Sequence, residues 1–353
     1  MALKAAVSPD AGVRRRLRQR PGDDGLLTLY CPIRGDLVRM EAIMGGVARA
    51  SGHMIRPMAR HLLRRPGKRI RGALVLFAAK AGNAPRRSDA AHRIDAPWLA
   101  AAAEMLHTAS LIHDDIVDGA SLRRGQPSLH ARWGTHRAVL MGDFLLAWNF
   151  SELARRFPVE VVRVLLRAAK TACDGEIEET GMAYRADLTE PQYLRIAAKK
   201  TGALTSAACE AGAILGGASP AVRSALRRYG ESFGTAFQLV DDALDFTAHT
   251  GEVGKPVGRD MVEGRFTMPV LSLRRILRGA ERRRLYSLLT PPSLSNGGAR
   301  RVVELVRSRG GVACALERAG AYAARARAAL RGVPPAAAEP LAALADYVVR
   351  RRR

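Results

Sequence analysis

The sequence predicts an all-α fold in which one large domain follows a short basic arm. Apolar residues recur at helical spacing along most of the 353 residues, as in Leu37, Met40 and Met44. Alanine, the strongest helix former, is abundant, whereas aromatic residues make up only 5% of the chain. Strand alternation and hairpin signals are not found. We therefore predict a single helical domain over residues 31–353 and a flexible basic arm over residues 1–30.

The chain is strongly basic, with a formal net charge of +24 at pH 7. Such a charge could attract nucleic acid or anionic lipid. The basic residues are spread along the chain, however, and all but seven of the 57 Lys and Arg residues are arginines. No basic patch interleaved with aromatics is present, so we predict no nucleic-acid partner. The basic runs at 14–20 and 350–353 are expected to be solvated, frayed tails, and a weak contact with a membrane surface stays open for them.

Cysteine use and hydropathy indicate the compartment. The four cysteines, Cys31, Cys173, Cys209 and Cys314, are far apart and form no Cys-x-x-Cys pair. A zinc site or a disulfide framework is therefore not expected, and a reducing compartment fits. No apolar run is long enough to span a bilayer. We predict a cytoplasmic protein.

Two Asp-Asp-x-x-Asp clusters are the central feature of the sequence. The first contains Asp114, Asp115 and Asp118, and the second contains Asp241, Asp242 and Asp245. Residues four apart lie on one face of a helix, so the carboxylates of each cluster gather and repel one another. A hard cation such as Mg²⁺ relieves this repulsion, and it is usually held by one or two carboxylates plus substrate phosphates. One copy could be a solvated acidic helix end, but two copies favour a metal-bound diphosphate held between facing clusters.

Basic residues suited to phosphate accompany both clusters. Lys68 and Arg71 follow a Pro-Gly break at the start of a predicted helix, where backbone N–H groups favour anions, although a solvated basic cap explains them equally well. Arg123 and Arg124 lie in a loop just after the first cluster, and arginine binds phosphate bidentately. Lys255 lies in a glycine-rich loop after the second cluster, which lacks the Gly-Lys-[Ser/Thr] ending of a nucleotide P-loop.

His107 precedes Asp114 by seven residues, which is about two helical turns, so the two side chains share a face. A histidine in this position could be an ordinary core residue. Beside a phosphate site we interpret it as a ligand of the substrate.

Together these motifs resemble the trans-isoprenyl diphosphate synthase (polyprenyl synthetase) family over roughly residues 33–349. Residues 67–71 resemble the family's Gly-Gly-Lys-Arg-x-Arg-Pro segment, and residues 107–115 resemble its first aspartate-rich motif. Arg123 and Arg124 resemble the paired arginines that follow, and residues 237–242 resemble the second aspartate-rich motif. The resemblance implies an isoprenoid-synthase-type helical bundle around a central cavity, usually as a homodimer.

The resemblance also implies roles for the site residues in a Mg²⁺-dependent condensation of isopentenyl diphosphate with an allylic diphosphate. Up to about three Mg²⁺ ions would be held by the two clusters, Asp114, Asp115, Asp118, Asp241, Asp242 and Asp245. Isopentenyl diphosphate would be bound by Lys68, Arg71, His107 and Arg124. The allylic diphosphate would be bound by Arg123, Lys200, Thr201, Gln238 and Lys255. Besides the aspartates, the residues that would take part in the chemical step are Lys200, Thr201 and Gln238.

Four positions depart from the family pattern. Pro66 precedes Gly67 where the family usually has Gly, and Gly72 replaces the usual Pro. Arg265 stands where lysine is common and should still serve as a cation. Glu179 falls where Gln is frequent, which places an extra acid near the implied site.

Ala109 and Ser110 predict the length of the product. They lie five and four residues before Asp114, which is about one helical turn below it. Short-chain members of the family tend to place aromatic residues here as a floor for the growing hydrocarbon. Because both residues are small, we expect an all-trans prenyl diphosphate longer than farnesyl, namely geranylgeranyl or longer.

Two alternatives share the fold. A terpene cyclase also ionises a prenyl diphosphate, but it needs no isopentenyl site, so Lys68, Arg71, His107 and Arg124 argue against it. A non-catalytic subunit of a heteromeric synthase is disfavoured because both aspartate clusters are complete.

Overall fold

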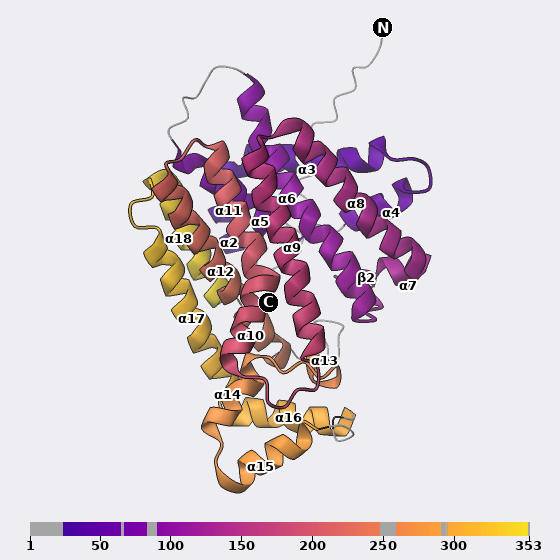
Figure 1. Cartoon of the computed structure of the whole chain (residues 1–353), viewed down its shortest axis with the longest axis vertical. Coiled ribbons are helices and arrows are strands. Elements are labelled where there is room, and N and C mark those ends of the chain that lie inside the picture. Colours follow the sequence, from indigo (N-terminus) through magenta and orange to yellow (C-terminus); the bar gives the residue numbers. More distant parts are fainter. Residues whose placement is uncertain are drawn as a thin grey trace. The chain divides into compact units, whose positions relative to one another are not determined.

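The computed structural model describes residues 24–64, 67–82, 90–247, 259–290, 294 and 296–351. In this part of the chain the structure is helical apart from one two-stranded hairpin, which confirms the predicted all-α class (Figure 1). None of the described helices combines the length and the apolar character that crossing a bilayer requires.

The chain divides into two compact units. Unit 1 contains the described residues up to Leu165, together with Ala208–Arg223 and Gly332–Leu344. Unit 2 contains Leu166–Ala207, Ser224–Arg331 and the described residues from Ala345 onward. Four helices contribute residues to both units: α9 (Val159–Gly181), α11 (Ala203–Leu215), α12 (Pro220–Thr247) and α18 (Pro335–Arg350). The prediction of one domain over residues 31–353 stays a prediction.

Unit 1 carries the first aspartate cluster. Its other elements are α2 (Asp24–Leu29), η1 (Cys31–Ile33), α3 (Arg34–Ala50), α4 (Arg56–Leu63), α5 (Ile70–Ala78), η2 (Ala79–Ala81), α6 (Ala90–Val117), β1 (Leu122–Arg123), β2 (Gln126–Pro127), α7 (Leu129–Trp133) and α8 (Thr135–Arg156).

Helix α6 lies at the centre of unit 1 and packs against α3, α5 and α8 (Figure 1). Its stretch from Leu99 to Ala103 is buried, and four of those five residues are alanines. Small side chains let neighbouring helices approach closely, and apolar burial of this kind is the main stabilising contribution to a helix core. The packing fixes α6 as the rigid element whose last turn carries Asp114 and Asp115, and Asp118 follows directly after its end.

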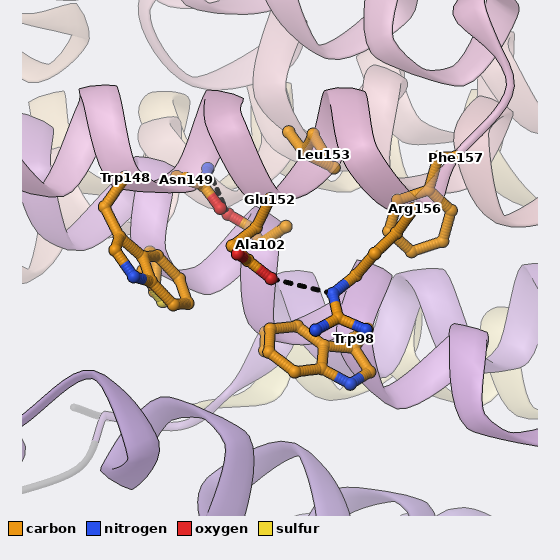
Figure 2. A pocket seen from close by; sticks show the side chains of 10 residues that line it. Trp98, Ala102, Trp148, Asn149, Glu152, Leu153, Arg156 and Phe157 are labelled. Atoms are coloured by element: carbon orange, nitrogen blue, oxygen red, sulfur yellow. Dashed lines mark hydrogen bonds and ion pairs between the residues drawn. The ribbon is translucent and has the colours of Figure 1, made fainter. Parts of the chain in front are cut away.

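A group of aromatic and charged side chains joins α6 to α8 (Figure 2). The rings of Trp98 and Trp148 are stacked with centroids 6.3 Å apart, and the Arg156 guanidinium lies 3.6 Å from the Trp98 ring centroid. Glu152 accepts a hydrogen bond from Arg156 Nε at 2.8 Å, and Asn149 Nδ2 donates to the Ala102 carbonyl at 3.2 Å (Figure 2). The cavity between them measures only about 10 Å³, so we interpret this group as a packing contact that holds α6 against α8.

The beginning of the described chain differs from the predicted arm. Residues 24–29 form α2, and both Leu26 and Tyr30 are buried. The Tyr30 hydroxyl donates a hydrogen bond to the Lys68 carbonyl at 2.9 Å, which ties this segment to the loop before α5. Because Leu26 and Tyr30 bury apolar area, residues 24–30 belong to the folded part of unit 1. The rest of the predicted arm, residues 1–23, lies outside the described residues.

Unit 2 carries the second aspartate cluster on α12. Its other elements are α10 (Glu190–Ala197), the π-helical turn η3 (Ala198–Gly202), α13 (Arg259–Val262), α14 (Met268–Ile276), α15 (Gly279–Leu288), α16 (Asn296–Ser308) and α17 (Gly311–Ala329).

Two glycines bring η3 and the start of α11 against α12. A Cβ atom on Gly230 would lie 2.5 Å from the Thr205 carbonyl oxygen, and one on Gly234 would collide with the Thr205 hydroxyl. The Thr205 hydroxyl in turn donates to the Gly230 carbonyl at 2.7 Å. Glycine is therefore required at both positions of α12 for this close approach. The approach sets Thr201 of η3 beside Gln238, one turn before the second cluster.

Candidate active site

The first cluster uses its three aspartates differently. Asp115 is buried, and both of its carboxylate oxygens lie 2.7 Å from Arg123 Nε. Asp114 and Asp118, four residues apart, are half-buried. A buried carboxylate needs such a partner, because an uncompensated charge in this position costs several kcal/mol, about 3–5 in measured cases. Arg123 therefore orients Asp115, whereas Asp114 and Asp118 have partly accessible carboxylates.

A tight hairpin presents the two arginines after this cluster. Strands β1 and β2 pair antiparallel, with Leu122 opposite Pro127 and Arg123 opposite Gln126. The two turn residues, Arg124 and Gly125, have φ values of 51° and 71°, as a type I′ turn requires. The sequence did not predict this hairpin, because the usual signal is Asn-Gly, and arginine is uncommon at positive φ. The turn aims the Arg124 guanidinium at Gly67, where a Cβ atom would lie 2.5 Å from Nη2.

Arg69, the middle basic residue of the segment 68–71, is turned into the core. It has a left-handed backbone with φ of 56°, and its Nε donates to Glu41 at 2.6 Å. Its Nη1 lies 3.4 Å from Glu104, whose Oε1 also accepts from the Gly72 N–H at 3.0 Å. Burial alone would lower the pKa of Arg69, but the two carboxylates outweigh it and raise the pKa. Arg69 therefore has a structural role.

This network also explains why Gly72 replaces the family's usual proline. The N–H of Gly72 donates to Glu104, and proline has no N–H to donate. A Cβ atom at this position would also lie 2.5 Å from the Met40 sulfur. The departure therefore adapts the backbone to the Arg69–Glu104 network and leaves Lys68 and Arg71 as the other cations of the segment.

His107 lies within the electrostatic influence of the arginines predicted to bind substrate. Burial lowers its pKa most, and the charges of Arg71, Arg124 and Arg123 lower it further, so the imidazole is neutral at pH 7. These three arginines belong to the same unit as His107, and their charges act on its ionisation. Unit 1 thus gathers Arg71, His107, Arg123 and Arg124 into one strongly positive region, which favours an anionic ligand.

A cavity of about 70 Å³ opens beside this region, entirely within unit 1. Arg123, Arg124 and Asp115 line its polar side, and Leu111 and Leu129 belong to its apolar side. The cavity is large enough to hold water, and guanidinium groups line part of it. When an anion binds to these arginines, water or polar atoms of the anion could occupy the cavity.

The second cluster is organised around a buried network. Asp242 is buried; it accepts a hydrogen bond from the Tyr193 hydroxyl and one from Gln238 Nε2 at 2.8 Å. Thr201 donates to Gln238 Oε1 at 2.6 Å. Burial raises the pKa of Asp242 and outweighs the opposing hydrogen bonds from Tyr193 and Gln238. Tyr193 was not predicted from the sequence, since no pattern connects it with a residue 49 positions away.

Asp241 is paired with a residue that we expected to be frayed. Nη2 of Arg351 lies 2.6 Å from Asp241 Oδ1, and it also donates to the Phe237 carbonyl at 3.1 Å. The guanidinium lies 3.9 Å from the centroid of the Phe237 ring. Only 5% of the Arg351 side chain is exposed, so the prediction of a solvated tail is wrong at this residue. The cause is a contact between residues 110 positions apart in the chain, which local sequence patterns cannot predict.

The accessible carboxylates of the two clusters have the chemistry of divalent-cation ligands. Asp241 is exposed, and Asp114, Asp118 and Asp245 are half-buried, so each cluster retains accessible oxygen ligands. Within the described ranges, no three or more His, Cys, Asp or Glu side chains are placed to hold an ion by themselves. Mg²⁺ is typically coordinated by one or two carboxylates, and phosphate and water oxygens supply its other ligands. A metal site that is complete only when a diphosphate is bound agrees with this arrangement.

Lys200 is held between two acids in unit 2. It lies on η3, and its ammonium contacts Glu176 at 2.7 Å and also Glu179. Burial alone would lower the pKa of Lys200, but Glu179 and Glu176 outweigh it and raise the pKa. The departure at Glu179 thus gives Lys200 a second carboxylate partner. π-Helical turns are frequent at functional sites, in agreement with the predicted role of this segment.

The remaining predicted residues are placed as follows. Lys255 lies outside the described residues. Arg265 pairs with Glu263 and lies 3.4 Å from Asp260. Ala109 is fully buried, whereas Ser110 is half-buried and its hydroxyl donates to the His107 carbonyl at 3.0 Å. Of the two predicted floor positions, only Ser110 shares the helix face of Asp114.

Comparison with known proteins identifies the family of this chain. The polyprenyl synthetase family model matches residues 53–306. A nonaprenyl diphosphate synthase of Mycobacterium tuberculosis is 36% identical over 331 residues, which are 93% of this chain and 96% of that protein. A short chain isoprenyl diphosphate synthase of Methanothermobacter thermautotrophicus is 40% identical over 234 residues, which are 65% of this chain and 70% of that protein.

A solved structure is similar over nearly the whole chain. The crystal structure of a polyprenyl synthase from Caulobacter crescentus, complexed with calcium and isoprenyl diphosphate, has a TM-score of 0.84 and 34% sequence identity, covering 95% of this chain and 100% of that one. The chain belongs to the polyprenyl synthetase family. It is accordingly a trans-prenyltransferase, and its family works with a divalent metal.

Proposed function

We propose that the chain condenses isopentenyl diphosphate with an allylic diphosphate, with Mg²⁺ as the metal, to make an all-trans polyprenyl diphosphate longer than farnesyl. The observation that carries the proposal is the gathering of Arg71, Arg123 and Arg124 around a neutral His107 in the unit that holds the first aspartate cluster. A terpene cyclase ionises one prenyl diphosphate and needs no separate site for isopentenyl diphosphate.

In unit 1 the proposal assigns isopentenyl diphosphate to Lys68, Arg71, His107 and Arg124. A neutral imidazole can donate one hydrogen bond to a phosphate oxygen, while the guanidinium groups supply the charge. Asp114 and Asp118 are proposed as metal ligands, and Asp115 as a ligand whose orientation depends on Arg123.

As the resemblance implies, the proposal assigns the allylic diphosphate to Arg123, Lys200, Thr201, Gln238 and Lys255, and metal ligation in the second cluster to Asp241, Asp242 and Asp245. When bound, up to about three Mg²⁺ ions would stabilise the negative charge that develops on the departing diphosphate. The Thr201–Gln238–Asp242 hydrogen bonds hold three of these side chains in one fixed arrangement, which supports a positioning role for Thr201 and Gln238. The proton lost from the isopentenyl carbon is proposed to pass to the released diphosphate.

A product longer than farnesyl is supported by the small side chain of Ser110 on the face of Asp114, and by similarity to the nonaprenyl diphosphate synthase. Ser110→Phe is expected to shorten the product, because an aromatic ring there would fill the space one turn below Asp114. Ala109→Phe is expected instead to disturb packing, since Ala109 is fully buried.

We also propose a homodimer in the cytoplasm. Exposed apolar side chains on α8, Val139 and Leu140, support this proposal, because a partner chain could cover them. Four free cysteines, two of them exposed, support a reducing compartment. Sedimentation of the purified chain tests the dimer, and a monomer at micromolar concentration would contradict it.

The decisive experiment is a product assay. The purified chain is incubated with MgCl₂, isopentenyl diphosphate and geranyl, farnesyl or geranylgeranyl diphosphate, and the chains are separated and weighed by mass spectrometry. Linear products longer than farnesyl are expected. Farnesyl as the only end product would refute the chain-length argument, a cyclic hydrocarbon would favour a terpene cyclase, and an inactive chain would favour a non-catalytic subunit.

The roles of the clusters are tested by substitution. Asp114→Ala and Asp241→Ala are each expected to reduce turnover about 100-fold or more at saturating MgCl₂. Asp174→Ala is the matched control, because Asp174 is exposed and pairs only with Lys170 among the described contacts. Near-normal turnover of either cluster variant would contradict the assignment.

A further inference from the structure

Arg351 contacts the second aspartate motif at three points on one face of α12. Its Nη2 lies 2.6 Å from Asp241 Oδ1 and 3.1 Å from the Phe237 carbonyl oxygen, and its guanidinium lies 3.9 Å from the Phe237 ring centroid. Phe237 and Asp241 are four residues apart, so one planar group covers both. Stacking and a charged hydrogen bond together favour arginine over lysine in such a contact.

The surroundings of Asp241 are rich in negative charge. Asp242 lies next to it in the chain, and Asp245 follows one helical turn later on the same face of α12. Without a cation, these carboxylates repel one another. Arg351 supplies a cation at Asp241, the exposed member of the motif.

We infer that Arg351 is a positioning residue that acts as the counter-ion of the second aspartate cluster in the metal-free protein and competes with the divalent metal for Asp241. This inference rests on the proposed function only in taking Asp241 as a metal ligand. An arginine on Oδ1 must be displaced, or must share that carboxylate, when a metal ion binds there.

A second observation shows that the guanidinium is not saturated where it lies. Arg351 Nε is buried and has no hydrogen-bond partner among the described residues. A buried donor without a partner is unfavourable, so the contact leaves Arg351 less tightly held than a fully hydrogen-bonded arginine. A guanidinium held by one carboxylate oxygen, one carbonyl and a ring can be exchanged for a divalent ion.

The test measures metal binding without turnover. MgCl₂ is titrated into the full chain at a fixed, saturating concentration of inorganic pyrophosphate, and the melting temperature is followed to obtain the midpoint concentration of Mg²⁺. Arg351→Gln keeps a long polar side chain and removes the charge. Its midpoint is expected to fall about three- to tenfold below that of the parent, because the competing cation is gone. Its metal-free melting temperature is expected to fall as well, because the cluster loses its counter-ion.

Two further variants separate charge from packing. Arg351→Lys keeps the charge, and its midpoint is expected to stay within twofold of the parent. Arg350→Ala is the matched control: this neighbouring side chain is 79% exposed and lies 3.6 Å from Asp346 on its own helix, so no change is expected. An Arg351→Gln midpoint equal to or above that of the parent overturns the inference, as does an equal shift in both Arg351 variants.

Failure of the inference is distinguishable from failure of the proposed function. If the parent chain makes long prenyl diphosphates and Arg351→Gln leaves the Mg²⁺ midpoint unchanged, only the counter-ion role fails. If the parent makes no prenyl product but the midpoint falls in Arg351→Gln, the counter-ion role stands and the proposed function fails.

Discussion

Replacing Tyr193 with phenylalanine removes one hydroxyl from the network around Asp242 and leaves the ring in place. Asp242 is buried and has two hydrogen-bond donors, Tyr193 and Gln238 Nε2. Removing the donor leaves a buried polar group unsatisfied, which costs about 1–3 kcal/mol. We therefore expect Tyr193→Phe to lower the free energy of unfolding by about 1–3 kcal/mol.

The assay is urea unfolding at pH 7, with and without MgCl₂ and inorganic pyrophosphate. Tyr322→Phe is the matched control, because the Tyr322 ring contacts Arg325 and its hydroxyl has no hydrogen bond to the described residues. That control should change stability by less than about 0.5 kcal/mol. If Tyr193→Phe were no more destabilising than the control, the hydrogen bond to Asp242 would not hold the carboxylate, and Tyr193 would have no part in the network.

Three other predictions concern charged groups. Arg69→Met should lower the free energy of unfolding by about 3–5 kcal/mol in urea, because Glu104 is left as a buried charge without its cation; a loss below about 1 kcal/mol would contradict this. The pKa of His107 is lower in the folded chain than its unfolded value of about 6.5, so unfolding takes up a proton as the pH falls below that value and stability declines. His107→Gln should remove up to about 1.4 kcal/mol per pH unit of this decline between pH 6.5 and 5. An equal pH dependence of the free energy of unfolding in parent and variant, measured with urea, would argue against this prediction. Glu179→Gln should lower the KM for the allylic diphosphate about three- to tenfold, because Lys200 then keeps one carboxylate partner; an unchanged KM would mean that Lys200 does not bind this substrate.

The helical class could be predicted from the sequence because its signal is local. Periodic apolar residues and alanine act within a few turns, and α6 and α12 both carry their aspartate clusters on such stretches. The family was also within reach, since its motifs are short and occur in a fixed order. The predicted facing of the two clusters, and the roles of their residues, stay predictions.

Contacts between distant residues could not be predicted in the same way. Arg351 reaches Asp241 across 110 positions, and Tyr193 reaches Asp242 across 49. Neither pair shares a helix, so no periodicity connects them. The inward turn of Arg69 was equally hidden, because it depends on a left-handed backbone that arginine seldom adopts. Sequence motifs thus predicted the residues of the candidate site but not the side chains that hold them in place.

The hairpin after the first cluster has a consequence for anyone who engineers this enzyme. Arg124 occupies a turn position where asparagine is the preferred residue, and its positive φ is a source of strain of about 1 kcal/mol or more. A library screened for heat resistance alone is therefore expected to enrich Arg124→Asn. Such variants would tolerate higher temperature but would lack the guanidinium that we propose binds isopentenyl diphosphate. Screens at this loop should select for product formation first and durability second.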